Sequence, residues 1–309
     1  MKKTLAAALT LACGFGSLVS SDAAAAQKKS VAPPAKPRLD VNKPEDVIAI
    51  DRRTSCSTED GKEALYWWKG NVYSRIPGEK DRLLFGVHGM NFRTCKSFSD
   101  PKRGPGYRSV SREMLIYVDK DTGEVLRKWK NPWTGEEVDV LHVANDPVSM
   151  REPTYAYAAD GTPRTLRGDI KDGWVLGGGG AARLFYTNPL GGDYQDHIGG
   201  TYHAMEFGTD AAKLDDLTDP DTTWVKDRVL TWVRVSKWLP WMKMGGRIGV
   251  VVFHTAGLRL ESFDEMPAVV KTEIRSNWPV FQSAPPPDDT RPSMTSWDQF
   301  KRWKGEKRD

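Results

Sequence analysis

The sequence lacks the motifs that would place it in a common class of enzyme. It has three cysteines and five histidines in 309 residues, with no CxxC pair and no Cys/His spacing of the kind that binds zinc. It contains no G-x-S-x-G, H-E-x-x-H or P-loop motif, and no G-x-G-x-x-G leading into a helix. These absences disfavour a thiolate metal site and leave no standard catalytic motif.

The sequence also has little excess charge and few long apolar runs. Its formal net charge is +4, and removal of residues 1–26, which hold two lysines and one aspartate, lowers it to +3. No stretch combines a basic run with base-stacking aromatic residues, so we expect no nucleic-acid partner. Beyond the N-terminus no segment is apolar enough to cross a membrane, so we expect no transmembrane segment in the mature chain.

The first 26 residues have the three parts of a cleavable secretory signal. Two lysines form a basic start, residues 4–19 are uncharged and mostly apolar, and residues 24–26 are small alanines of the kind that signal peptidase accepts. Cys13 also suggests a lipoprotein, but Thr10 stands where leucine is usual and the apolar stretch before Cys13 is short. We therefore predict a periplasmic or secreted protein without a lipid anchor.

Residues 27–42 are rich in Lys, Pro and Ala and predict an extended leader. Residues 43–53 predict a short helix, because Pro44 suits its first position and the following acidic residues favour its N-terminal dipole. Neither an internal repeat nor a second domain is evident. We therefore expect residues 43–309 to form a single β-rich domain that ends in a capping helix.

Short aromatic or β-branched stretches separated by turn residues follow, as is typical of strands. The first expected hairpin pairs residues 64–73 with residues 83–92 across Pro77 and Gly78. Further strands are expected at residues 111–118, 124–129, 137–143, 155–158, 174–176, 182–187, 202–207, 228–235 and 248–255. Many short strands with little helix between them predict a mainly β, antiparallel barrel-like or sandwich domain.

Helices are expected only near the C-terminal end, at residues 267–277 and 296–304. The second has a capping box at Thr295 and Asp298, with Trp297, Phe300 and Trp303 roughly along one face. We expect this aromatic face to pack across the barrel and close one mouth.

Two glycine-bearing segments invite functional interpretations that the sequence disfavours. Residues 119–123, Asp-Lys-Asp-Thr-Gly, are similar to the start of a calcium loop but lack its final glutamate, so a tight turn between strands is preferred. The four glycines at 177–180 are followed by no Lys-Ser/Thr pair, so a wide turn or bulge is preferred to a phosphate site.

Two cysteines remain after removal of the signal, Cys56 and Cys95. They lie near the ends of the first expected hairpin, where an antiparallel pairing brings chain ends together, and an oxidising periplasm would allow them to join. We predict a disulfide; the alternative is two buried free thiols.

Four histidines fall within expected strands: His88, His142, His203 and His254. By strand alternation His142 and His254 each share a face with valines, which predicts core-facing rings. Imidazoles that point into a barrel suit metal binding or acid–base catalysis, because their charge changes near neutral pH. The alternative for each ring is a singly hydrogen-bonded core histidine, and their convergence on one cavity is left open.

Polar and aromatic residues near these histidines are candidates for a ligand pocket: Trp68, Asn91, Arg93, Asn145, Arg234, Trp238 and Trp241. The two arginines suit bidentate binding of a carboxylate, or else structural salt bridges. Most of the 12 tryptophans are expected to fill the core. Residues 238–244 carry too much Pro and Met for a plain strand, so we predict that they form a pocket rim.

Three groups of motifs stand out as a set. They are Tyr-Trp-Trp-Lys-Gly at 66–70 with Leu-Phe-Gly-Val-His-Gly-Met-Asn at 84–91; Asn-Pro-Trp-Thr-Gly-Glu at 131–136 with Val-Leu-His-Val-Ala-Asn-Asp-Pro-Val at 140–148; and Trp-Leu-Pro-Trp-Met-Lys-Met-Gly-Gly-Arg at 238–247. Together they resemble the bacterial family catalogued as domain of unknown function 1838, over about residues 45–280. The resemblance implies that the three groups belong to one domain, and it assigns no activity, cofactor or catalytic residue.

These features favour an exported protein that binds a small hydrophobic or aromatic molecule in an aromatic-lined, barrel-like cavity. The second hypothesis is an enzyme, a lyase, isomerase or hydrolase, that uses His142 with His88, His203 or His254, with or without a metal. A third is a structural or interaction domain of the cell envelope. The sequence names no cofactor.

Overall fold

The computed structural model describes residues 36–149, 152–186 and 202–305. The expected signal peptide, Cys13 and most of the expected leader lie outside these ranges. From Pro37 onward the described residues belong to one compact unit. None of the helices described is long and apolar enough to cross a membrane.

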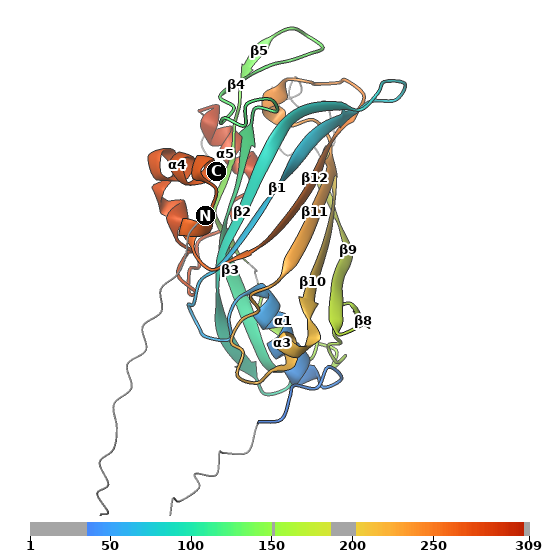
Figure 1. Ribbon diagram of the computed structural model, residues 1–309, viewed down its shortest axis with the longest axis vertical. Helices are drawn as coiled ribbons and strands as arrows, with labels where there is room; N and C mark the ends of the chain where they lie inside the picture. Colours follow the sequence, from blue (N-terminus) through green and yellow to red (C-terminus); the bar gives the residue numbers. More distant parts are fainter. Residues whose placement is uncertain (1–35, 150–151, 187–201, 306–309) are drawn as a thin grey trace, which may run out of the picture. The chain divides into compact units, whose positions relative to one another are not determined.

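An antiparallel sheet of ten strands dominates this unit (Figure 1). Nine strands follow one another in the order β6, β3, β2, β1, β12, β11, β10, β9 and β8, and β7 pairs with β3. Their bounds are β1 Ala64–Arg75, β2 Arg82–Asp100, β3 Gly104–Val118, β6 Val143–Ser149, β7 Thr154–Tyr155, β8 Asp169–Lys171, β9 Trp174–Tyr186, β10 Tyr202–Lys213, β11 Val229–Ser236 and β12 Val250–Leu260. A separate hairpin joins β4 (Lys128–Lys130) to β5 (Glu137–Asp139).

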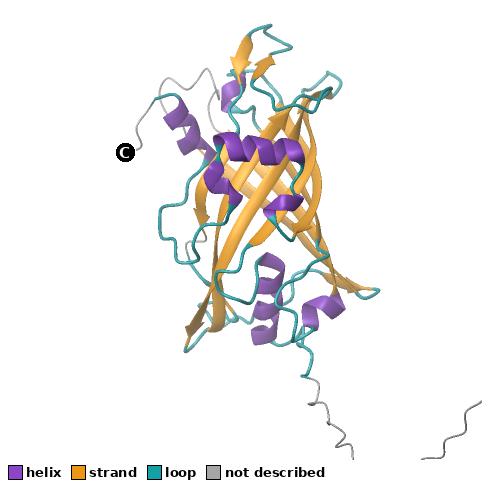
Figure 2. Ribbon diagram, turned by 60° about the vertical axis from the view of Figure 1, so that its left-hand side comes forward, coloured by secondary structure: helices purple, strands orange, loops and turns teal. Residues whose placement is uncertain are grey.

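The prediction of a mainly β, antiparallel domain with C-terminal helices is confirmed, but the sheet is open. Within the described residues its edge strands β6 and β8 do not pair with each other, so no closed barrel forms. Strands β2 and β3 are 19 and 15 residues long, longer than expected. Long twisted strands curl a sheet, and Figure 2 shows them crossing steeply, with helices against one side.

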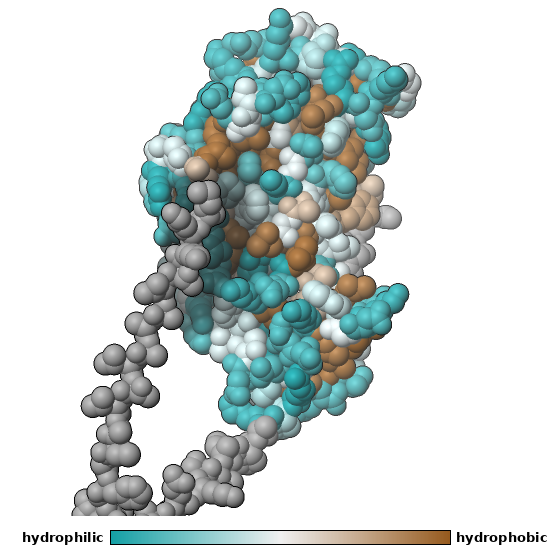
Figure 3. Space-filling model, in the orientation of Figure 1, coloured by the Kyte–Doolittle hydropathy of each residue, from teal (hydrophilic) through white to brown (hydrophobic). Residues whose placement is uncertain are grey.

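The curled sheet has two different faces. Its inner face carries an aromatic core of Phe85, Tyr117, Trp129, Trp241 and Phe253, in which neighbouring ring centres lie 5.1–6.4 Å apart. The outer face of β1–β3 packs against helix α4 (Ala268–Asn277), which buries a second set of apolar side chains. The outer face of β10–β12 leaves apolar side chains exposed, and Figure 3 shows apolar residues scattered among polar ones over the strands in view.

The other helices lie at the ends of the sheet. Helix α1 (Pro44–Ser55) begins at the proline that the sequence indicates, and α3 (Leu214–Thr218) packs beside it. Helix α5 (Ser296–Trp303) begins with the expected capping box of Thr295 and Asp298. It buries Trp297 and Phe300 in the core, whereas Trp303 is 45% exposed.

Both glycine-bearing segments are structural. Residues 119–123 form a turn in which the Asp119 carboxylate accepts from two backbone N–H groups and Gly123 has a φ of +74°. The return strand expected at 124–129 is wrong, since only Val125 bridges to β3 and β4 turns away to pair with β5. The glycines at 177–180 lie within β9 at a shift in its register with β10, as a bulge.

The predicted disulfide is confirmed. Cys56, at the C-terminal end of α1, is bonded to Cys95 in β2, with their Cα atoms 5.9 Å apart. Both residues are fully buried. The bond attaches α1 to the sheet and agrees with folding in an oxidising compartment.

Candidate functional site

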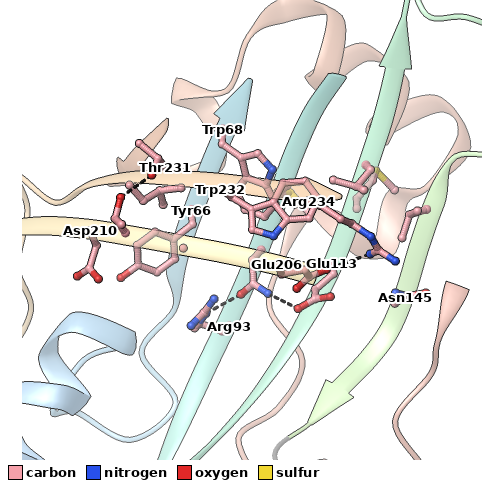
Figure 4. A pocket seen from close by; sticks show the side chains of 18 of the residues that line it. Tyr66, Trp68, Arg93, Glu113, Asn145, Glu206, Asp210, Thr231, Trp232 and Arg234 are labelled. Carbon is pink, nitrogen blue, oxygen red and sulfur yellow. Dashed lines mark hydrogen bonds and ion pairs between the residues drawn. The ribbon is translucent and has the colours of Figure 1, made fainter. Parts of the chain in front are cut away.

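A cavity of about 400 Å³ lies on the inner face of the sheet, between β1–β3 and β6 on one side and β10 and β11 on the other (Figure 4). Its volume falls within the range of small-molecule sites, about 300–1,000 Å³. Aromatic, charged and amide side chains share its walls: Tyr66, Trp68, Trp232, Arg93, Glu113, Glu206, Asp210, Arg228, Arg234, Asn91 and Asn145.

Tyr66 stands in this cavity among three guanidinium groups. The guanidinium carbons of Arg93, Arg228 and Arg259 lie 5.0, 5.3 and 5.5 Å from its ring centre. Its hydroxyl donates to the carbonyl oxygen of Thr54 and accepts from Arg228 Nη1 at 2.9 Å. Burial by itself raises the pKa of Tyr66, but the charge of Arg228, then of Arg259 and Arg93, prevails, so the pKa lies below its ordinary value.

A chain of hydrogen bonds links Arg93 to Glu113. Arg93 Nε donates to Asn91 Oδ1 at 2.5 Å, and Asn91 Nδ2 donates to Glu113 Oε1 at 2.8 Å. Burial is the largest influence on Glu113 and raises the pKa of its carboxyl, with Glu206 adding like-charge repulsion; Arg93 opposes the rise only in part. Glu113 therefore holds a proton more readily than an exposed glutamate.

Two ion pairs fix the opposite wall. Arg234 Nη1 lies 3.0 Å from Glu206 Oε1, and these residues face each other in the register of β10 and β11. Arg228 Nη2 lies 2.8 Å from Asp210 Oδ2. Charge-assisted pairs of this kind hold side chains in defined positions. The charged groups of the cavity are therefore largely ordered by one another.

Among the buried polar atoms of the cavity wall, Asn145 Oδ1 and Trp68 Nε1 have no hydrogen-bond partner in the part of the chain that the structure describes. Asn145 is only 6% exposed. A buried polar group left unpaired costs about 1–3 kcal/mol. The cavity wall thus contains two polar atoms whose hydrogen-bonding capacity the described residues leave unused.

Glycines make room for this arrangement. A Cβ atom at Gly89 would lie 2.0 Å from the indole of Trp68, so only glycine lets that ring lie against β2. Gly208 lines the opposite wall, where an added Cβ would meet nothing nearer than the Thr231 carbonyl oxygen at 3.9 Å. Gly89 positions an aromatic ring, whereas Gly208 leaves open space.

Five of the seven predicted ligand residues line this cavity: Trp68, Asn91, Arg93, Asn145 and Arg234. That they bind a ligand stays a prediction. The other two lie in the packed core and not in the wall of this cavity, although Trp241, with Leu239 and Pro240, borders a smaller recess beside it. Trp238 and Trp241 are each 3% exposed, because a 3₁₀ turn at Pro240–Met242 leaves both indoles buried in the aromatic core.

The four candidate histidines do not converge on the cavity. His88 lies on the outer face of β2, where its Nδ1 accepts from Trp67 Nε1 at 3.2 Å and burial, then Lys69, lowers its pKa to about 4. His203 is exposed in β10. Only His142 lies on the inner side, buried beside Tyr117 just before β6.

The core-facing prediction for His254 is wrong. The buried row of β12 is Val251, Phe253 and Thr255, so His254 points outward with Val252. Both rows of this strand are apolar, since the outer face of β10–β12 carries exposed valines and leucines. Alternation identified the residues that share a face but not which face is inside.

Sequence reasoning missed Tyr66, Glu113 and Trp232 as cavity residues. Tyr66 precedes Trp68 by two positions, so alternation within one strand was a usable signal. Glu113 lies opposite Asn91 in the register of β2 and β3, and Trp232 lies opposite Gly208. Those two placements follow only from the pairing of strands, which one sequence does not reveal.

No group of three His, Cys, Asp or Glu side chains suited to a metal ion occurs within the described ranges. A family described as "Protein of unknown function (DUF1838)" matches residues 61–304. The chain belongs to this family. The match confirms the resemblance seen in the motifs, and every residue named above in the cavity wall lies within the DUF1838 segment. No curated protein matches the sequence.

Proposed function

We propose that this DUF1838 protein binds a small aromatic molecule in the cavity of the inner face. The observation that carries the proposal is the pair of unpartnered atoms, Asn145 Oδ1 and Trp68 Nε1, in a wall whose other charged groups are mostly paired. Ligand sites typically combine apolar and aromatic walls with a few polar groups that fix orientation. Tyr66, Trp68 and Trp232 supply the aromatic surface.

The proposed ligand is flat and carries both hydrogen-bond donors and acceptors. Asn145 Oδ1 offers an acceptor and Trp68 Nε1–H a donor, so a plain hydrocarbon would satisfy neither. The disulfide agrees with the predicted export, and we place this binding in the periplasm or outside the cell.

Gly208→Leu tests the proposal by filling the cavity from its open wall. Equilibrium dialysis of naphthamide, a flat aromatic whose carboxamide has both a donor and an acceptor, against the folded, disulfide-bonded protein should show binding by the wild type and at least a tenfold loss in the variant. Native mass spectrometry should show any co-purified compound in the wild type only. Phe207→Leu, one residue away on the opposite face, is the matched control and should bind as the wild type does.

Binding that survives Gly208→Leu would place the ligand elsewhere and contradict the proposal. The absence of any bound compound in the wild type would leave the envelope interaction domain as the better hypothesis.

The second candidate is acid–base catalysis in the same cavity. The observation that favours it is the pair Glu113 and Tyr66, one with a raised and one with a lowered pKa, since perturbed groups gather at catalytic sites. It replaces the histidine-based enzyme, whose rings lie apart. Incubation of the wild type and Glu113→Gln with a bacterial metabolite extract tests it: a compound consumed by the wild type alone supports catalysis, and identical extracts argue for binding only.

A further inference from the structure

A small recess of about 40 Å³ lies beside the cavity on the side of the aromatic core. The two spaces share Leu115, Val143, Arg234 and Ser296 in their walls. The remaining wall includes the aromatic rings of Tyr117, Trp241, Phe253 and Phe300. The recess holds a group of a few heavy atoms, because one water needs about 10–15 Å³ of such space.

His142 brings one hydrogen-bond donor to this recess. It is 4% exposed, and its Nδ1 accepts from the backbone N–H of Tyr117 at 3.1 Å. Burial lowers the pKa of its imidazole to about 4, against the opposing charge of Glu273, so the ring is neutral at pH 7. With Nδ1 accepting, the single proton resides on Nε2, which has no acceptor in the described residues.

Trp241 brings a second donor. It lines the same recess, is 3% exposed, and its Nε1–H likewise has no acceptor in the described chain. The amide of Gln299, also in this wall, is already engaged. Its oxygen accepts from the Ala144 N–H at 2.9 Å and its nitrogen donates to the His142 carbonyl at 2.7 Å. Two residues of the recess wall therefore each carry a buried donor that has no acceptor in the described chain.

The charges nearby favour an anionic acceptor. Three arginines and three carboxyl groups line the main cavity, and a fourth arginine, Arg259, stands behind Tyr66. Four arginines thus stand against three carboxyl groups, which leaves the balance positive. Arg234 lines the cavity and the recess alike.

We propose that the recess is the head-group subsite of the cavity and binds the carboxylate of an aromatic acid, whose two oxygens accept from His142 Nε2–H and Trp241 Nε1–H. The ring system of that acid occupies the main cavity. This inference rests on the proposed function, and it adds to it the chemical class of the ligand.

Three probes test it: methylnaphthalene, acetylnaphthalene and naphthoate, substituted at the same ring position. They share one ring body and differ in having no acceptor, a neutral carbonyl or a carboxylate. Calorimetry should rank naphthoate tightest, by about tenfold or more over methylnaphthalene, since hydrogen bonds to a charged group are strong.

Two variants remove the donors singly. Trp241→Phe deletes the indole N–H, and His142→Asn deletes Nε2–H while its amide oxygen still suits the Tyr117 N–H. Each variant should bind naphthoate about tenfold more weakly than the wild type and bind methylnaphthalene with unchanged affinity. Trp238→Phe is the matched control in the same segment, because the Trp238 N–H already donates to the Arg247 carbonyl at 3.0 Å. This variant should change the affinity for neither probe.

The Trp241 indole N–H signal, in protein labelled at tryptophan and assigned with Trp241→Phe, gives a direct readout. It should move on addition of naphthoate and stay in place with methylnaphthalene. If the wild type binds naphthoate and methylnaphthalene equally, or if the variants lose affinity for both equally, the recess does not bind the carboxylate. Either result would overturn the proposed subsite and leave the proposal of aromatic binding intact. Equal binding of acetylnaphthalene and naphthoate would overturn the carboxylate. If none of the three probes binds the wild type, aromatic binding itself is wrong.

Discussion

The inner face of the sheet holds aromatic side chains in two regions that differ in what lies between the rings. In the aromatic core, Phe85 is surrounded by Tyr117, Trp241 and Trp129, with ring centres 5.1, 5.7 and 6.2 Å away. In the cavity, Trp68 and Trp232 approach to 6.1 Å, but much of the surrounding wall is charged or polar, and Gly208 lies opposite Trp232. Similar aromatic residues are thus close-packed in one region and border open space in the other.

The difference shows that the number of aromatic residues does not create a binding site on this sheet. Rings fill space when other rings oppose them, as in protein interiors generally. Next to the cavity, the inner position opposite Trp232 is Gly208, and Glu113 and Glu206 repel each other across the opening. Small and charged residues therefore keep the cavity open, and the aromatic residues only line it.

The largest expected effect is on stability. Phe85→Ala should lower the free energy of unfolding by about 3–5 kcal/mol, because Phe85 is fully buried and its removal leaves a void among rings that cannot close in. Trp232→Ala, in the partly open cavity wall, should cost about 1–2 kcal/mol. Urea unfolding with the disulfide intact measures both. Equal costs would mean that the cavity is as tightly packed as the core.

The second effect is an acid sensitivity that originates at His142. The pKa of its imidazole falls from 6.5 to about 4 on folding. Between these two pH values, the His142 ring is therefore protonated in the unfolded chain but neutral in the folded protein. Its contribution to stability is complete above pH 6.5 and is lost as the pH falls toward 4, by about 3 kcal/mol. His142→Asn should make the unfolding free energy depend less steeply on pH in this window, and His88, whose pKa is likewise lowered to about 4, accounts for part of the slope that remains. His254→Asn, on the exposed outer face, is the control and should leave the slope unchanged.

Glu113, in the cavity, should make the free energy of unfolding depend on pH in the opposite direction. Its pKa is raised on folding, so its contribution is present in acid and is lost as the pH rises through the folded value. Glu113→Gln keeps an acceptor for Asn91 and removes the charge. The variant should therefore gain stability relative to the wild type as the pH rises from acid to neutral. A relative loss instead would show that the arginines, and not burial, control this carboxyl.

Five cavity residues were predictable because sequence patterns report local features well. Trp68, Asn91 and Arg93 lie where alternation and turn signals place polar or aromatic groups beside an expected strand, and the structure brings them together. Residues 238–244 were expected at a pocket rim, but their two tryptophans are buried in the core, and the segment borders only the small recess. A Pro- and Met-bearing segment breaks a strand equally well in a rim or in a core, and only the tertiary packing of Trp238 and Trp241 decides between them.

Strand order and the inner face were beyond reach of one sequence. His254 has apolar neighbours on both faces of β12, so nothing local distinguishes inside from outside. Glu206 and Glu113 line the same cavity and repel each other although they lie on strands that are far apart in the sheet order. Such contacts depend on the curl of the whole sheet, which arises from many strands together.

The smallest effect separates the two glycines that border the cavity. Gly89→Ala should cost about 1–3 kcal/mol, because its methyl group would overlap the Trp68 indole, 2.0 Å away, and push the ring toward the cavity. Gly208→Ala should be neutral or stabilising by up to about 1 kcal/mol, since alanine restricts the unfolded chain more than glycine does and its methyl group meets open space. Paired urea titrations measure the difference, and methylnaphthalene binding by Gly89→Ala reports whether the ring has moved. If the two alanines have the same effect, Trp68 is free to yield, and the cavity is shaped less by Gly89 than by the charged groups around it.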